Sequence, residues 1–448
     1  MADVQAPAPA GQSPASPTLP PAPPVPAGAA TGPAARDGRV AGKGVVVAYV
    51  LAYFTLYIAL LTPVISTLAL KVDALSTPDD RAGNLALVTG VGAFFAFVAN
   101  PLAGALSDRT TSRLGMRRPW LLWGVLLGSV GLLLIAAAPT IGVVVLGWAI
   151  AQMAFNGTQA ALQAILPDQV AEQQRARVSG LLGMVQQLAP LVGIGLAFGF
   201  TAADADQIWI FVVPTALALV GVLALVAVLK DRHLPKGDLE AFRLGAFLQG
   251  FWVSPRRYPD FAWAFAGRFL MLFGFALYNT YQLYFLSDRF GFDSATALSW
   301  QLRLMVVQAV LLVVASTVGG ALSDRTGRRK VFVVVATLLA GSGLAVFAVA
   351  HDPAVLYVGA SLFGAGLGAY FAVDLALVTD VLPNAETEAA KNMGVFNIAN
   401  ALPQSVAPAL APAFLALGGG GNYTALFAIS AVIVAVGAVA TMFIRGAR

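Results

Sequence analysis

Two charged residues, Arg268 and Asp374, lie inside long apolar stretches of the sequence, where ionisable side chains are rare and usually functional. If both stretches are helices that run in opposite directions, a rise of about 1.5 Å per residue puts the two at comparable depth. We expect a pair that binds a polar ligand or changes partner; a static pair that only joins two helices is the alternative.

Arg303, near the middle of another stretch, has no acidic residue at its level. It is expected either to meet an anionic or hydroxyl-rich ligand or to cap backbone carbonyls.

Amide and phenol side chains recur at helical spacing on other apolar stretches, and a spacing of four puts successive members on one helix face. Rings that stack and amides that donate and accept suit a ligand rich in hydroxyls, such as a sugar. The same groups also bond helices to one another in membranes, so each has a purely structural alternative. The candidate binding set is Tyr53, Tyr57, Gln152, Asn156, Gln159, Tyr278, Asn279, Gln282, Asn397 and Asn400.

The composition favours a membrane protein and excludes several other classes. The chain of 448 residues is 58% apolar and 11% charged, against about 45–50% and about 25% in a soluble domain. It has no cysteine and two histidines, so we expect no metal, no cofactor and no enzymatic activity, because no nucleophile and base share a depth. The net charge of +5 is spread over short loops, which disfavours nucleic acid as a partner.

The elements that must position these residues are apolar runs of about 20 residues or more, the length at which a helix crosses the hydrocarbon of a bilayer. The sequence predicts an all-α membrane protein with twelve such helices. They span residues 44–70, 84–107, 119–138, 141–166, 178–200, 208–229, 260–286, 295–322, 331–350, 354–380, 392–417 and 423–444.

These runs divide the chain into five parts. Residues 1–43 form a tail rich in alanine and proline, which we expect to be disordered because it cannot bury enough apolar surface. A half of six helices, 44–229, is followed by a charged loop, 230–259, a second half of six helices, 260–444, and a short end, 445–448.

The basic residues set the expected orientation, because short loops rich in lysine and arginine stay in the cytoplasm. With both termini inside, the cytoplasmic segments hold 22 of the 27 basic residues. Arginine outnumbers lysine, and alanine and glycine are abundant, which suggests a bacterial genome. We therefore expect a multi-pass protein of a bacterial cytoplasmic membrane, with the lipid bilayer around a monomer and both termini in the cytoplasm.

The two halves repeat each other. The segment 104–110 recurs as 320–326, and 165–168 is echoed by 381–384, both at an offset of 216 residues. Two repeats with an even number of crossings have the same orientation and are related by an axis along the membrane normal. This arrangement predicts a ligand cavity between the halves.

The repeated loops carry a motif. Gly-x-x-x-Asp-Arg-x-Gly-Arg-Arg, present as Gly320, Asp324, Arg325, Gly327, Arg328 and Arg329, resembles the cytoplasmic loop signature of the major facilitator superfamily. The longer version in the first half, with Gly104, Asp108, Arg109, Arg117 and Arg118, is similar to that of the sucrose and glycoside-pentoside-hexuronide carriers. Met116 departs from it, because those carriers usually have arginine there.

The resemblance implies a fold, a mechanism and roles for these loops. Asp324 would face the fifth helix and Asp108 the eleventh, and the contacts would latch the halves when the cytoplasmic side is closed. The glycines would allow close helix approach. An aspartate near a helix N-terminus is favoured by the free N–H groups and the dipole. The alternative for the arginines is that they only determine topology.

The resemblance further implies a secondary active transporter that works by alternating access. We expect proton-coupled symport of a sugar or glycoside, so the partners are a small solute and protons. Apart from the helix ends, the first four helices contain no carboxylate, so coupling would rest on Asp374 or on the edge groups Asp168 and Asp380. The alternative is an exporter of drugs or secondary metabolites by proton antiport, since residues 189–193 partly resemble an exporter motif. A receptor or scaffold without transport is a rival from another class.

Overall fold

The apolar runs form helices in the computed structural model, which describes residues 42–234, 245, 253–383, 385–418 and 421–446. In the first half these are α1 (Lys43–Thr62), the π-helical η1 (Pro63–Thr67), α2 (Leu68–Leu75), α3 (Arg81–Ser107), α4 (Arg118–Ala136), α5 (Ile141–Gln169), α6 (Glu172–Ala202) and α7 (Trp209–Val228). In the second half they are α9 (Pro259–Phe290), α10 (Ser294–Thr326), α11 (Arg329–Val349), α12 (Val355–Asp380), α13 (Ala385–Leu415) and α14 (Tyr423–Met442).

The predicted all-α class is confirmed. With α1, η1 and α2 taken as one interrupted helix, the described chain has twelve long helices. Eleven of them are long and apolar enough to cross a membrane, and the remaining one, α13, begins with a polar stretch. Most of the predicted tail, much of the predicted central loop and residues 447–448 lie outside the described residues.

The helices extend beyond the predicted runs at several ends. Helix α6 begins at Glu172 and α9 continues to Phe290, each a turn or more past the apolar run. Hydropathy marks only the part of a helix that lies in hydrocarbon, whereas backbone hydrogen bonding continues into the polar layer. The positions of the helices were therefore predictable and their ends were not.

The internal repeat extends to how the helices pack. In the first half, a Cβ atom at Gly131 of α4 would meet the carbonyl oxygen of Gly147 of α5 at 2.5 Å. In the second half, a Cβ atom at Gly343 of α11 would meet that of Gly359 of α12 at 2.7 Å. Small residues let membrane helices approach closely. The third and fourth helices of each half therefore pack through an equivalent pair of glycines.

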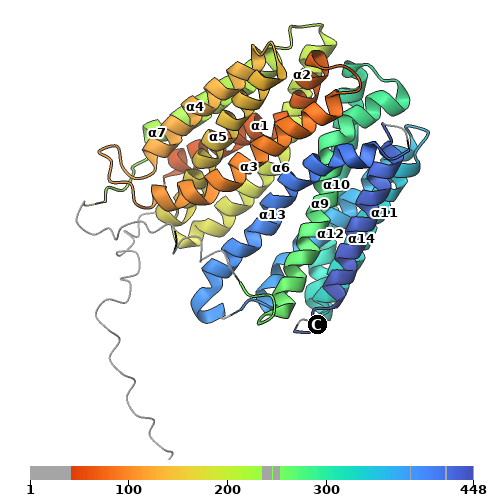
Figure 1. Cartoon of the computed structure of the whole chain (residues 1–448). Helices are drawn as coiled ribbons and strands as arrows, with labels where there is room; N and C mark the ends of the chain where they lie inside the picture. The colour runs from red at the N-terminus through yellow and green to blue at the C-terminus, as the bar shows by residue number, and fades with distance from the viewer. Residues whose placement is uncertain (1–41, 235–244, 246–252, 384, 419–420, 447–448) are drawn as a thin grey trace, which may run out of the picture. The chain divides into compact units, whose positions relative to one another are not determined.

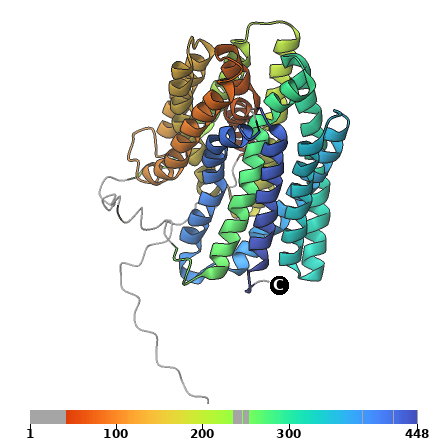
Figure 2. The same cartoon turned by 45° about the vertical axis from the view of Figure 1, so that its right-hand side comes forward.

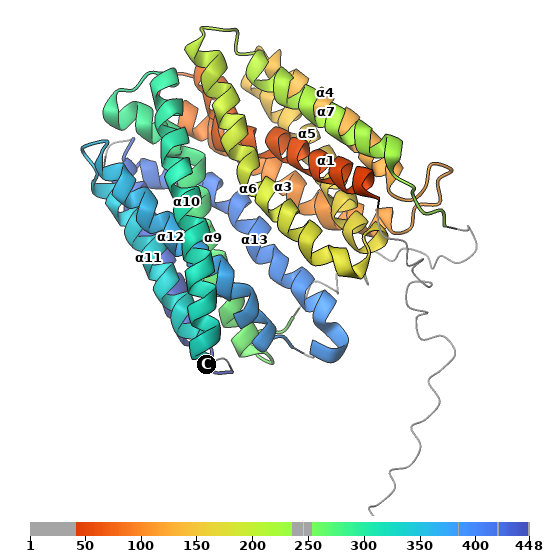
Figure 3. The same cartoon turned by 180° about the vertical axis from the view of Figure 1, so that it is seen from behind.

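The halves meet along a few helices. Helix α3 contacts α13, and α6 contacts α10, as Figures 1 and 3 show. Within the second half, α9 (green) runs beside α14 (dark blue) in Figure 2. The interrupted first helix also contacts the other half, because η1 lies against α9. Residues on η1, α3, α9 and α10 are therefore placed to join the halves.

The first helix is interrupted by Pro63, which cannot donate a backbone hydrogen bond. The backbone N–H of Leu68 bonds to the carbonyl of Pro63, five residues back, and this widens one turn into the π-helix η1. Such turns are rare and frequently mark functional sites. Here the turn carries the buried Ser66 to the other half of the molecule.

The bundle has two ends, named here by their residues. The motif end holds the loop between α3 and α4, residues 108–117, and the turn between α10 and α11 at Gly327. The Arg81 end holds the opposite turns, between α2 and α3 and between α9 and α10. The predicted topology would place the motif end in the cytoplasm.

Candidate functional site

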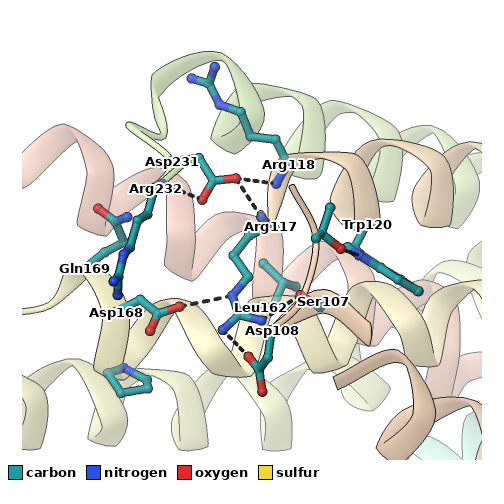
Figure 4. Close-up of polar contacts among 12 residues, drawn as sticks. Ser107, Asp108, Arg117, Arg118, Trp120, Leu162, Asp168, Gln169, Asp231 and Arg232 are labelled. Carbon is teal, nitrogen blue, oxygen red and sulfur yellow. Dashed lines mark hydrogen bonds and ion pairs between the residues drawn. The ribbon is translucent and has the colours of Figure 1, made fainter. Parts of the chain in front are cut away.

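Arg117 is the centre of the polar cluster at the motif end of the first half (Figure 4). Its side chain is buried and bonds three groups: Nε donates to Asp168 at 3.0 Å, Nη1 to Ser107 at 2.6 Å and Nη2 to Asp108 at 2.5 Å. The planar guanidinium suits such a site because its donors point in fixed directions. The cluster joins the end of α3, the start of α4 and the end of α5.

Asp231, which the sequence reasoning missed, holds this cluster from the chain that follows α7. One carboxylate oxygen accepts from the backbone N–H of Arg117 at 2.6 Å and of Arg118 at 2.8 Å (Figure 4). These N–H groups belong to the start of α4 and have no partner within the helix, so a carboxylate there caps the helix and favours its dipole. The backbone N–H of Met116 also donates to the carbonyl of Arg232 at 3.0 Å.

Gly115 makes this docking possible, which leads to a stability prediction. Its φ angle is +103°, and a Cβ atom there would lie 2.4 Å from a carboxylate oxygen of Asp231. Replacement by alanine should lower the free energy of unfolding by about 1–2 kcal/mol or more, because L residues resist this backbone conformation and Asp231 must move. The measurement is the thermal midpoint of the purified protein in detergent.

Gly180→Ala is the matched control for that prediction. Gly180 lies on the helical stretch of α6, its φ is not positive, and a Cβ atom added there would meet open space. Alanine is the better helix former, so this variant should be as stable as the parent or more so. Equal midpoints for the two variants would show that the contact with Asp231 is unimportant.

The loop of the second half is more exposed than its counterpart. Asp324, Arg325 and Arg328 are exposed, whereas Arg329 bonds Asp380 at 2.7 Å. Gly327 ends α10 with a φ of +64°, the left-handed conformation that favours glycine after a helix. In each half, therefore, an arginine at the start of the third helix pairs with an aspartate at the end of the fourth.

The contacts implied by the family resemblance are only partly present in this state. Asp108 bonds Arg117 of its own half, and within the described residues no hydrogen bond or ion pair joins Asp324 to α6. The expected close approach holds at Gly320, whose Cβ would lie 3.6 Å from Ala372, and fails at Gly104, where the space is open. Arg109, also predicted as a gating residue, is exposed. The interhelical latch remains a prediction for the state in which this end is closed.

Within the membrane region, the structure brings Arg268 and Asp374 together. Arg268 of α9 forms an ion pair with Asp374 of α12, donates from Nε to Asn400 of α13 at 2.5 Å and lies 4.8 Å over the ring of Phe396. Asn400 in turn donates to Asn397 at 2.8 Å. The side chains of the pair are 13% and 4% exposed, so the charges are almost completely removed from solvent and satisfy each other.

The predicted row on α5 faces the tyrosines of α1. Gln159 donates to the hydroxyl of Tyr57 at 2.5 Å, and the rings of Tyr53 and Tyr57 stack with centroids 4.7 Å apart. Asn156 donates to the side chain of Gln152 at 2.8 Å. Gln159 lies ten residues before the end of α5 and Arg268 nine after the start of α9, so the two groups are both about 14 Å from the motif end.

The remaining predicted residues separate from these two groups. Tyr278 and Gln282 are buried and bonded to each other at 2.5 Å, and Tyr278 also accepts from Gln308. Asn279 is half-buried. Arg303 is exposed and lies 5.5 Å from the ring centre of Trp300, a pairing common where helices leave the hydrocarbon. The predicted set is therefore three local groups, with Asn279 and Arg303 outside them.

The comparisons with known proteins define the class. Two repeated halves of apolar helices with buried polar groups describe a polytopic membrane protein of the carrier type. The family model for the Major Facilitator Superfamily matches residues 45–302 and 294–448, and the chain belongs to that superfamily. The predicted resemblance is confirmed, and the chain is a transporter of a small solute rather than an enzyme.

Similar proteins agree with this assignment. The nucleoside transporter NupG has a TM-score of 0.66 at 14% identity, covering 90% of this chain and 98% of its own. A bacterial homologue of the human lysosomal transporter Spinster, inward-facing and occupied, has a TM-score of 0.65 at 14% identity, covering 90% and 95%. The general alpha-glucoside permease of Schizosaccharomyces pombe is 24% identical over 182 residues, which is 36% of this chain and 33% of that permease. The match thus spans about a third of the permease.

Several polar residues of these groups were missed from the sequence. Gln301 and Gln308 lie seven residues apart on α10, two helical turns, and both bond to other helices. Their spacing on an apolar helix was the same signal that singled out the α5 row. The buried hydroxyl of Tyr370, one turn before Asp374 on α12, interacts with the carboxylate of Asp374. No sequence pattern marked Tyr370.

Proposed function

We propose that the protein is a proton-coupled symporter that moves a sugar or glycoside across a bacterial cytoplasmic membrane by alternating access, with its termini in the cytoplasm. The observation that carries the proposal is the buried Arg268–Asp374 pair, held by Asn400 and Phe396. Among the described helical carboxylates, Asp374 alone lies more than one turn from a helix end. It is therefore the candidate proton carrier.

Coupling follows from the electrostatics of this pair. A buried arginine stays charged, so its partner must be an anion or a set of strong acceptors. When Asp374 takes up a proton, Arg268 loses its counter-charge, keeps its bond to Asn400 and turns to new acceptors such as solute hydroxyls. When the solute leaves, Asp374 releases the proton and the ion pair forms again. Proton uptake and solute binding thus favour each other.

The polar groups support a hydroxyl-rich solute. The amide and phenol groups of the first half, Gln159 and Tyr57, lie at a similar distance from the motif end. Amides and aromatic rings are the groups that bind sugars. The partial likeness to an alpha-glucoside permease points the same way.

The test is uptake into liposomes that contain only this protein. Radiolabelled sucrose, maltose and related glycosides are supplied with and without an inward proton gradient, and a nucleoside serves as a competing solute. We expect accumulation of one glycoside above its external concentration only with the gradient. Saturable uptake would also exclude a receptor or scaffold without transport.

The opposite outcome is equally informative. If folded protein moves no glycoside in either condition, the sugar assignment is wrong, and an exporter of drugs or secondary metabolites becomes the leading hypothesis. That hypothesis predicts proton-driven extrusion of a lipophilic dye from inverted vesicles. Glycoside uptake that has the same rate and the same final level with and without the gradient would retain the substrate and overturn the coupling.

A further inference from the structure

The hydrogen bonds and ion pairs that join described residues of the two halves lie at the Arg81 end. Arg81 of α3 pairs with Asp288 of α9, and Tyr281 and Tyr284 of α9 donate to the carbonyls of Ala82 at 3.2 Å and Ala69 at 2.9 Å. The last contact is made deeper in the bundle, where Gln301 of α10 meets η1. None of these contacts was used in the proposed solute site.

The outer layer of these contacts is ionic. Arg81 also pairs with Asp73 of its own half at 3.0 Å and lies 5.1 Å over the ring of Tyr284. Asp288 accepts a second bond, from the hydroxyl of Tyr423 at 2.6 Å. The side chains of Arg81 and Asp288 are 20% and 27% exposed. Because water can replace the lost contacts, separating such a pair is much cheaper than separating a buried one.

The inner layer is neutral and fully buried. Ser66 donates to the side-chain oxygen of Gln301 at 2.6 Å, and the amide of Gln301 donates to the carbonyl of Ile65 at 3.1 Å. Both side chains have no exposed surface. A buried amide that loses its partner is costly, so this layer holds its geometry until water or another polar group replaces the bond. The π-helical turn of η1 is what brings Ser66 to it.

We propose that these two layers form the gate that closes the Arg81 end of the carrier. The proposal rests on the alternating-access function proposed above. The ionic layer around Arg81 stabilises the closed state, and water solvates its charged groups when this end opens. The Ser66–Gln301 layer seals the path beneath it. Opening this end separates Arg81 from Asp288 and Ser66 from Gln301 together, because the same two bundles carry both pairs.

The absence of cysteine from the chain allows a test by thiol labelling that needs neither solute nor protons. The labelling rate of Ser66→Cys measures how accessible the Arg81 end is to the reagent. Gln163→Cys, on the exposed continuation of the Gln159 stripe, reports the other end. Each single-cysteine protein is labelled in liposomes with a thiol reagent, with and without Arg81→Asp. That substitution places a third carboxylate beside Asp73 and Asp288 and should favour opening.

The expected result is reciprocal. Arg81→Asp should raise the labelling rate of Ser66→Cys about tenfold or more, as expected when a population shift of about 1.4 kcal/mol exposes it, and lower that of Gln163→Cys. Adding Asp288→Arg should restore both rates, because the new arginine can pair with Asp73 and the introduced carboxylate. Unchanged rates would overturn the gate. A rise at both reporters would also overturn it, since that indicates loosening rather than a change of state.

A cross-linking experiment checks the inner layer independently. The pair Ser66→Cys and Gln301→Cys is treated with a short bifunctional thiol reagent, and each single variant is the control. We expect efficient cross-linking of the pair, lower yield after Arg81→Asp, and loss of transport that returns when the linker is cleaved. If cross-linked protein transports at the uncross-linked rate, these residues do not gate. If transport is absent for every solute but the labelling is reciprocal, the gate stands and the solute assignment fails.

Discussion

Replacing Asp374 by asparagine is expected to abolish gradient-driven solute accumulation. Asparagine cannot carry a proton, and it leaves the charge of Arg268 buried without a carboxylate. Because the proton gradient can then no longer drive the solute, uptake should fall to the level measured without a gradient. The measurement is initial uptake in proteoliposomes with an inward proton gradient. Asp352→Asn, an exposed carboxylate in a loop, should transport normally.

Stability measurements separate folding from function in this pair. Removing one partner of a buried ion pair costs about 3–5 kcal/mol, whereas neutralising both is much milder. The double variant Arg268→Gln with Asp374→Asn should therefore recover most of the thermal midpoint lost by Asp374→Asn, and still fail to accumulate solute. A charge-swapped variant, Arg268→Asp with Asp374→Arg, that folds and transports normally would show that the pair is only a static link between helices.

Replacing Arg117 by alanine is expected to have the second largest effect. The substitution removes bonds to Ser107, Asp108 and Asp168 at once and leaves two carboxylates without their cation. The arginine side chain is buried, but Asp108 and Asp168 are 62% and 32% exposed, so water can solvate the carboxylates left behind. We therefore expect a loss of about 1–3 kcal/mol in the free energy of unfolding and a strong fall in the transport rate. Arg117→Lys should rescue little, because an ammonium group cannot reach three partners in fixed directions.

Arg113→Ala is the matched control for Arg117. It removes one positive charge from the same loop, and the contact of Arg113 with His233 uses only its backbone carbonyl. If the loop arginines act only as topology determinants, the two alanine variants should have equal, small effects on thermal midpoint and uptake. We expect Arg113→Ala to remain close to the parent in both measurements. A small effect of Arg117→Ala on the thermal midpoint and on uptake would contradict the role of the cluster.

The parts of the fold and site that were predictable share a physical cause. Apolar runs mark the helices because hydrocarbon excludes polar side chains, and depth along two helices was enough to pair Arg268 with Asp374. The α5 row met Tyr57 because spacing of four defines one helix face. Each of these inferences depends on periodicity along a single element and the direction in which that element runs.

The contacts that were missed depend on tertiary placement. Asp231 has no helical spacing to the loop it holds and lies 114 residues from Arg117, so nothing in its neighbourhood marks it as a helix cap. Arg81 was not among the predicted site residues, although it bonds Asp73 and Asp288. The depth of Arg303 was counted from the ends of an apolar run. Because α10, with 33 residues, is longer than one crossing needs, that count does not fix the depth of Arg303 in the bilayer.

The measurement that tests the central claim most directly is proton movement caused by the solute itself. Liposomes containing the protein and an internal pH dye, with no proton gradient, receive the transported glycoside outside. The account predicts that the lumen becomes acidic as the solute runs down its own gradient, and that Asp374→Asn gives no such signal. Solute entry without acidification, or acidification that persists in Asp374→Asn, would contradict it.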